Sequence, residues 1–145
     1  MSRLEKVSAD LLALLGYVRD EYFRPAEQIT RAHLSPGQFH TLSTLGRKGG
    51  LPMSELAAEL KISKQQLTPM IAKMIDNRLV VRKTDAHDRR IVRIEISAAG
   101  QSTIETLMAE IKRNFTEKMS LIPEIELEEL EQIVTRMQDI LHHSR

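Results

Sequence analysis

The chain of 145 residues contains no cysteine. This absence excludes disulfides, thiolate zinc sites and cysteine-based redox switches. The chain also lacks tryptophan and has only two tyrosines and three phenylalanines. A hydrophobic core built from this composition must be aliphatic, with a contribution from the seven methionines. Such a core favours helices, and we expect a mostly α-helical protein.

Long apolar runs are also missing. No stretch approaches the roughly 20 apolar residues that a membrane-spanning helix needs. The first six residues, Met1 to Lys6, lead into a charged amphipathic segment rather than a signal peptide. We therefore expect no membrane partner and a cytoplasmic protein. The length suits one domain or two small interlocked subdomains.

The net charge of +1 conceals an uneven distribution of charge. Residues 61–93 contain nine lysines and arginines but only three acids, Asp76, Asp85 and Asp88. This window therefore carries a charge of +6, and the remaining 112 residues carry −5. Local basicity in a nearly neutral protein indicates a face that binds a polyanion. The plainer interpretation is a solvated helix face that happens to be rich in lysine.

The first half of the chain shows the spacing of amphipathic helices. Apolar residues at intervals of three or four predict a long first helix, with Pro25 at its end or at a kink (Leu4, Val7, Leu11, Leu14, Val18 and Tyr22). Ser35-Pro36 predicts the capped start of a second helix, which Gly49-Gly50 ends.

The middle of the chain predicts a helix-turn-helix followed by a hairpin. A short helix begins near Met53 and reaches Leu60, and Ser63 then opens the capping box "SKQQ" of the next helix. The inner face of that next helix is formed by Leu67, Met70, Ile71 and Met74. Two strands are expected, at 79–84 and 91–97, with the loop 85–90 between them. In the second strand, Val92, Ile94 and Ile96 should face one side, and Arg93 and Glu95 the other.

Two further long helices are expected after the hairpin. Ser97 should cap a helix that reaches Ile122 and stops at Pro123, and a last helix carries apolar residues from Leu127 to Leu141. The helices at both chain ends have narrow apolar stripes without an obvious partner in the compact middle. They could pair within one chain, but we expect them to bury their stripes across a two-fold axis, in a homodimer.

Three motifs resemble those of the MarR family of winged helix-turn-helix transcription regulators. They are "SELAAELKIS" leading into "KQQLTPMIAKM", the hairpin "RLVVRKTDAHDRRIVRIEIS", and "AAG" at the start of the following helix. The resemblance covers nearly the whole chain. It implies a winged helix-turn-helix DNA-binding domain at 34–97 and a helical dimerisation domain formed by 1–33 and 98–145.

The resemblance also implies how DNA would be read. The second helix of the pair would enter the major groove, and the hairpin wing would reach the neighbouring minor groove. Gln side chains can bond adenine, whereas Lys64 and Lys73 suit phosphates. Gln65 and Gln66 could instead serve only capping and solvation. The DNA-binding set is therefore expected to be Ser63, Lys64, Gln65, Gln66, Thr68, Lys73, Asp88, Arg89 and Arg90.

Within the wing, the three charged residues have different expected tasks. Arg89 is the candidate for insertion into a narrow minor groove, where negative potential is concentrated. Arg90 is expected to contact phosphate or to hold the wing against the body. Asp88 would be repelled by DNA, so its carboxylate should accept hydrogen bonds from an arginine or from the turn. The plainer interpretation is a charged surface turn.

The chain departs from the usual family pattern at four points. Lys61 stands where the family often has glycine in the turn, and Arg78 replaces the glycine that closes the recognition helix. That leaves Asn77 as the residue expected to adopt a left-handed cap. Pro69 lies inside the recognition helix and should bend it. The "LTP" run is similar to the branch that senses organic hydroperoxides, but this chain lacks the cysteine those sensors use.

No pairing of a nucleophile with a base suggests an enzyme, and we expect none, with no cofactor and no metal. The five histidines are scattered along the sequence. The resemblance implies instead a small phenolic or amphipathic effector, bound where the long helices meet the winged domain. Candidate lining residues are Tyr17, Tyr22, Phe39, His40 and Phe115, which could equally be ordinary core aromatics.

The expected function is therefore sequence-specific binding of double-stranded DNA by a ligand-responsive homodimeric repressor acting on a pseudo-palindromic operator. The alternative is a helical dimeric interaction module whose basic face binds an acidic protein partner. Double-stranded RNA is a more distant choice, because the deep major groove of an A-form helix excludes a protein helix.

Overall fold

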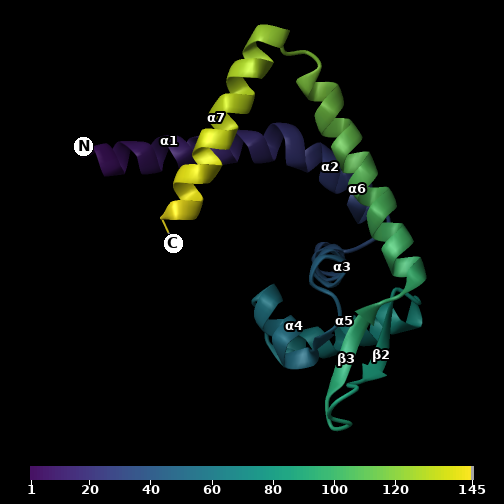
Figure 1. Cartoon of the computed structure of the whole chain (residues 1–145). Helices are drawn as coiled ribbons and strands as arrows, with labels where there is room; N and C mark the ends of the chain where they lie inside the picture. Colours follow the sequence, from purple (N-terminus) through teal and green to yellow (C-terminus); the bar gives the residue numbers. More distant parts are fainter. Residues whose placement is uncertain (145) are drawn as a thin grey trace.

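A computed structural model describes residues 1–144. The chain forms two regions that α6 connects (Figure 1). The lower region of that view contains α3 (Pro36–Lys48), α4 (Met53–Leu60), α5 (Lys64–Asp76) and a small sheet. The upper region contains α1 (Arg3–Val18) and α7 (Glu124–His143), while α6 (Ala98–Met119) runs from one region to the other. The mostly helical fold and the winged helix-turn-helix expected from the sequence are confirmed.

Three antiparallel strands form the sheet in the order β1-β3-β2. The hairpin pairs β2 (Val80–Thr84) with β3 (Val92–Ile96), so that Val80 lies opposite Ile96. On its other edge, β3 pairs with β1 (Leu51–Pro52), which the sequence did not predict. A strand of two residues has no periodicity to detect, and it exists only because β3 offers a free edge.

The hydrophobic core lies inside the winged region. Leu42 of α3, Leu56 of α4 and Leu67 of α5 are completely buried, as is Ile94 of β3. The N-terminal half of α6 closes this core with Ile104 and Leu107. Val92, expected on the same face as Ile94, is 43% exposed because the outer part of the hairpin projects beyond the core.

Serine caps begin α3, α5 and α6, as the sequence predicted. The hydroxyl of Ser35 accepts a hydrogen bond from the N–H of Gln38, and the Ser35 N–H donates to the Gln38 side chain. Ser63 and Gln66 form the same reciprocal pair at the start of α5, and Ser97 caps α6 through the N–H of Gly100. Each bond satisfies a backbone group that the helix itself leaves unpaired.

The first helix differs from the expectation that it ends or kinks at Pro25. Between α1 and α2 (Arg24–Arg31) lies a π-helical turn, η1 (Arg19–Phe23), and Pro25 falls in the first turn of α2. Because proline has no N–H, the carbonyl of Glu21 loses its usual helical donor, and the ammonium of Lys118 donates to it instead. A donor from α6 thus stabilises a widened turn that the local sequence does not specify.

The left-handed residue after α5 is Arg78, with φ of 60°, and the expectation of Asn77 was wrong. The N–H of Leu79 donates to the carbonyl of Met74, and the N–H of Arg78 donates to Ile75. This closing pattern requires the residue before Leu79 to be left-handed, whatever its type. Burial of Leu79 in the core therefore decides which residue is left-handed, and Arg78 adopts this less favourable backbone conformation.

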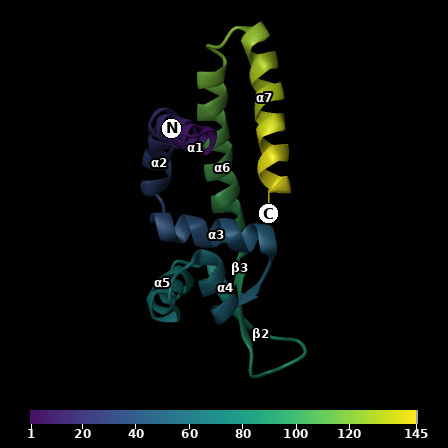
Figure 2. The same ribbon diagram turned by 90° about the vertical axis from the view of Figure 1, so that its left-hand side faces the viewer.

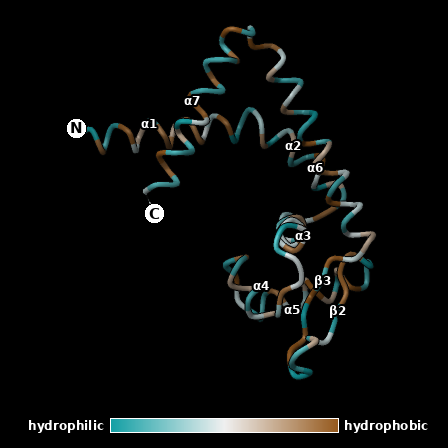
Figure 3. Tube along the Cα trace, in the orientation of Figure 1, coloured by the Kyte–Doolittle hydropathy of each residue, from teal (hydrophilic) through white to brown (hydrophobic). Residues whose placement is uncertain are grey.

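The two C-terminal helices form a hairpin of their own, which is best seen in Figure 2. The first of them, α6, ends at Met119 rather than at Ile122, and a short connection leads to α7 after Pro123. Apolar residues follow the lengths of α1 and α7, far from the core (Figure 3). No side chain of either helix is buried in the single chain. Within residues 1–144, none of the helices combines the length and the apolar character that crossing a bilayer requires.

Candidate nucleic-acid interface

The helix pair α4 and α5 meets through a tight turn. Lys61 adopts the left-handed conformation with φ of 54°, which explains why glycine would suit this position. The N–H of Lys61 donates to Ala58, and the N–H of Ile62 donates to Ala57. The turn thus closes α4 and directs Ser63, the first residue of the capping box, to the start of α5.

Several side chains that were expected to contact bases form hydrogen bonds within α5 and its cap instead. Ser63 and Gln66 bond one another in the capping box, with both N···O distances at 3.1 Å. The hydroxyl of Thr68 donates to the carbonyl of Lys64 at 2.8 Å. Lys64, Gln65 and Lys73 are exposed on α5. The helix continues through Pro69 without a break in its assignment from Lys64 to Asp76.

The wing loop is held by two aspartates. The carboxylate of Asp85 accepts hydrogen bonds from the N–H groups of His87 and Asp88, both at 3.0 Å. The carboxylate of Asp88 accepts three bonds from Arg90, one from its backbone and two from its guanidinium, at 3.0–3.1 Å. Asp88 thus has the internal role expected of it, and Arg90 is turned toward Asp88.

These hydrogen bonds also fix the charge of the loop. Backbone N–H donors at His87 and Asp88, assisted by Arg93, hold the pKa of Asp85 below its ordinary value. The guanidinium and the backbone N–H of Arg90 lower the pKa of Asp88 in the same way. Both carboxylates are therefore ionised at neutral pH, and each has its own cationic partner.

Arg89 differs from its neighbours. Its side chain is exposed at the tip of the wing, and it forms no ion pair or side-chain hydrogen bond with any residue from 1 to 144. Three of the nine basic residues in the window, Lys83, Arg90 and Arg93, are neutralised by acids on the hairpin. On the hairpin, Arg89 and Arg82 are thus the exposed cations without an acid partner among residues 1–144, and Arg89 is the one in the loop.

Asp85 and Arg93, to which sequence reasoning gave no role, hold the wing against the body. Arg93 donates to the Asp85 carboxylate at 3.2 Å and to the carbonyl of Gly50 at 2.6 Å. The strand register sets Arg93 opposite Lys83, so two cations would face one another without these acceptors. Lys83 turns instead to Glu95 at 3.0 Å. Opposed cations in a predicted hairpin are the signal that could have revealed these pairings.

The expected effector residues do not form one site. Tyr22 and Phe115 do meet, with ring centroids 5.5 Å apart, and Lys118 lies 5.3 Å from the centre of the Tyr22 ring. Phe39 lies elsewhere, in a cavity of about 300 Å³ between α2, α3 and α6. Tyr17 and His40 are exposed and line neither place.

Sequence reasoning missed the other walls of this cavity. Phe23 closes one side and also packs edge-on against Phe115, with ring centroids 5.2 Å apart. Met108 and Ile111 of α6 form the apolar floor, and Glu27 and Arg31 provide a charged rim. The cavity is therefore an apolar chamber with a polar edge, between a helix of the winged region and the helices that lead out of it.

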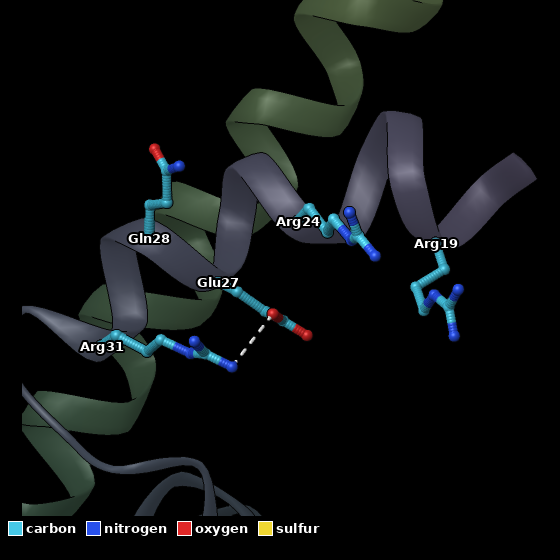
Figure 4. A pocket seen from close by; sticks show the side chains of 5 residues that line it. All are labelled: Arg19, Arg24, Glu27, Gln28 and Arg31. Atoms are coloured by element: carbon cyan, nitrogen blue, oxygen red, sulfur yellow. Dashed lines mark ion pairs between the residues drawn. The ribbon is translucent and has the colours of Figure 1, made fainter. Parts of the chain in front are cut away.

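A second, polar depression along η1 and α2 is lined by Arg19, Arg24, Glu27, Gln28 and Arg31 (Figure 4). Its arginines already have partners. Glu27 pairs with Arg31 at 3.5 Å, and Asp20 lies 3.2–3.3 Å from Arg24 and Arg19. These acids compensate most of the positive charge, so the depression is a poor anion site. Among residues 1–144, no three histidines or acids lie close enough to hold a metal ion together.

Comparisons with known proteins agree with this geometry. The family model described as the MarR family matches residues 34–92, which span the helix pair and most of the hairpin. The transcriptional repressor MdtR of Bacillus subtilis is 22% identical over 134 residues, covering 92% of this chain and 84% of MdtR.

Two solved structures show the same fold. A MarR family protein from Bacillus stearothermophilus superposes with a TM-score of 0.81, at 24% identity, over 98% of this chain and 99% of the other. A MepR mutant of Staphylococcus aureus bound to an oligodeoxyribonucleotide superposes with a TM-score of 0.70, at 22% identity, over 90% of this chain and 97% of the other. Over the helix pair and most of the wing, residues 34–92, the chain is therefore similar to MarR family transcriptional regulators, and the solved structures share its fold over nearly the whole length.

Proposed function

We propose that the protein is a sequence-specific repressor that binds double-stranded DNA as a homodimer on a pseudo-palindromic operator. The observation that carries this proposal is the exposed, unpaired Arg89 in the loop between β2 and β3, a loop that lies with α5 in the lower region of Figure 1. An α-helix fits the major groove, and an arginine suits a narrow minor groove beside it. The complex of the MepR mutant with an oligodeoxyribonucleotide supports DNA as the partner.

Charge supports the same assignment. Six of the nine basic residues in the window 61–93 have no acid partner among residues 1–144, and Lys64, Lys73 and Arg89 are exposed. The roles proposed for them are those of the sequence interpretation: Lys64 and Lys73 on phosphate, Gln65 on base edges and Arg89 in the minor groove. Ser63, Gln66, Thr68, Asp88 and Arg90 would position these contacts through the bonds they make within the chain.

The exposed apolar stripes of α1 and α7 support the homodimer. Leu4, Leu12, Ile125 and Ile133 are each more than 60% exposed, which is unusual for side chains of this size. Between the two helices lies a largely apolar groove of about 690 Å³, lined by Val7 and Leu11 and by seven residues of α7, four of which are apolar. The proposed dimerisation region is therefore 1–33 with 98–145, and a second copy would cover these stripes across a two-fold axis.

The cavity beside Phe23 and Phe39 is the proposed effector site. Its volume of about 300 Å³ is at the lower end of the range for small-molecule sites. The apolar walls and the charged rim of Glu27 and Arg31 suit a small amphipathic or phenolic compound. Because α2, α3 and α6 all line it, a ligand there would change how the reading domain sits on the long helices and so release DNA.

A titration against DNA over several salt concentrations tests the proposal. The protein should select a two-fold related sequence from a random duplex library and footprint on it as a dimer. About three phosphate contacts per protomer would give a slope of log K against log salt near −5. Weak binding without sequence preference, together with tight binding to an acidic protein, would instead support the interaction module.

A further inference from the structure

The exposed face of α5 has few polar groups left for reading bases. Ser63 and Gln66 are bonded to one another in the capping box, with distances of 3.1 Å. The Thr68 hydroxyl donates to the Lys64 carbonyl at 2.8 Å. Gln65 is therefore the one uncharged polar side chain in the first two turns that makes no hydrogen bond within the chain, while Gln66 keeps only its amide N–H groups unused.

The outward side of the helix has an apolar centre. Leu67, Ile71 and Met74 are buried at spacings of four and three. At 100° per residue, Gln65, Pro69, Ala72 and Asp76 lie on the opposite side, and all four are exposed. The sequence along this face is therefore one amide, two apolar residues and one acid.

The two ends of this face are not equivalent. The N-terminal end has the unpaired N–H groups of the helix and Lys64, both of which attract phosphate. Asp76 lies at the C-terminal end, where its charge would be repelled by a phosphate backbone. The major groove must therefore contact the first two or three turns of α5. Pro69 and Ala72 lie at the C-terminal limit of that contact.

Pro69 is not explained by the stability of α5. It is the sixth residue of the helix, beyond the first turn in which proline is well tolerated. It is exposed and contributes nothing to the buried face. Proline is the least favourable residue inside a helix, so its presence on the outward face points to a role outside the folded chain.

We propose that Pro69, flanked by Ala72 and the methyl group of Thr68, reads the C5-methyl groups of thymines in the major groove. Thymine is the base that presents an apolar group there, and an apolar ridge discriminates it from cytosine by contact rather than by hydrogen bonding. The inference rests on the proposed function, in which α5 enters the major groove.

Deoxyuridine provides the test, because it differs from thymine only by the missing methyl group. The wild-type protein first selects its preferred duplex from a random library, and each thymine of that duplex is then replaced singly by deoxyuridine. We expect one or two thymines in each half-site whose replacement lowers the affinity about three- to tenfold. Replacement of thymines outside the half-sites serves as the control and should leave the affinity unchanged.

The variant Pro69→Ala tests the residue. It should bind the thymine duplex more weakly by a similar factor, and it should no longer distinguish thymine from deoxyuridine at those positions. Its Tm should equal or exceed that of the wild type, because alanine favours the helix, so the weaker binding could not be attributed to unfolding. Gln65→Ala is the matched control on the same face: it should weaken binding and keep the sensitivity to deoxyuridine.

The outcomes separate the two proposals. If no duplex sequence is enriched, the proposed function fails. If a sequence is enriched but every deoxyuridine duplex binds equally well, the methyl-reading inference is overturned and the proposed function stands. If Pro69→Ala still discriminates against deoxyuridine at the same positions, Pro69 is not the reader.

Discussion

Replacing Gly100 with alanine should destabilise the protein strongly, because the added methyl group would meet the backbone. A Cβ atom at Gly100 would lie 2.1 Å from the carbonyl oxygen of Leu79 and 3.0 Å from Cγ1 of Ile96. That carbonyl accepts a hydrogen bond from the N–H of Ser97 at 3.0 Å, so it cannot turn away without losing this bond. The contact joins the end of α5, the hairpin and the start of α6, and it explains the glycine of the "AAG" motif.

The magnitude follows from two contributions. Relieving the clash requires a backbone shift of roughly 1 Å in a close-packed region, and overpacking of this kind costs about 1–3 kcal/mol. Weakening the bond between Ser97 and Leu79 adds about 1 kcal/mol. The free energy of unfolding should therefore fall by about 2–4 kcal/mol, with a drop in Tm on the order of 10 °C.

Thermal and urea unfolding of the two proteins at the same concentration measures this effect, and equal concentrations matter because a dimer's apparent stability depends on them. Gly46→Ala is the matched control. Its Cβ would meet only the side-chain oxygen of Gln101, at an ordinary 3.6 Å, within the helix α3. We expect the control to be as stable as the wild type or more stable by about 0.5–1 kcal/mol. A Gly100→Ala protein within about 0.5 kcal/mol of the wild type would refute the close-approach argument.

Four further predictions concern α5, the wing and the long helices. Arg89→Ala should weaken operator binding by about 1–3 kcal/mol, and the size of the loss should depend on the flanking sequence. Lys73→Ala should instead weaken binding to all duplexes equally and reduce the salt slope by about one unit. Equal losses for Arg89→Ala on operator, flank-swapped and random duplexes would contradict this. Arg89→Lys should recover only part of the binding, because an ammonium lacks the planar fork. Deleting residues 126–145 should abolish the dimer and specific binding together, and sedimentation showing a stable dimer would place the interface elsewhere. Hydrogen bonds lower the pKa of Asp85 in the folded state, so the Asp85 carboxylate should stabilise the fold above pH 3.8, the ordinary pKa. This stabilisation should be lost as the pH falls through the lower pKa of the folded state. An NMR titration of Asp85 with a midpoint at or above 3.8 would contradict this prediction.

Local chemistry in the sequence determined most of the helices, the serine caps of α3, α5 and α6, and the recognition unit. Ser35, Ser63 and Ser97 each bond a group three residues away, so a short segment contains both partners of every cap. The helix pair and the hairpin follow from apolar spacing in the same way. The exposure of Arg89 was also predictable, because a charged residue at the tip of a short loop has no protein around it.

Tertiary structure alone decided the features that depend on partners distant in the sequence. Arg93 bonds the carbonyl of Gly50, 43 positions away, and Lys118 bonds the carbonyl of Glu21, 97 positions away. The left-handed residue is Arg78 rather than Asn77, because burial of the following leucine sets the end of the helix. In each case the packing of other elements brings the deciding partner near, so the local sequence alone could not predict the contact.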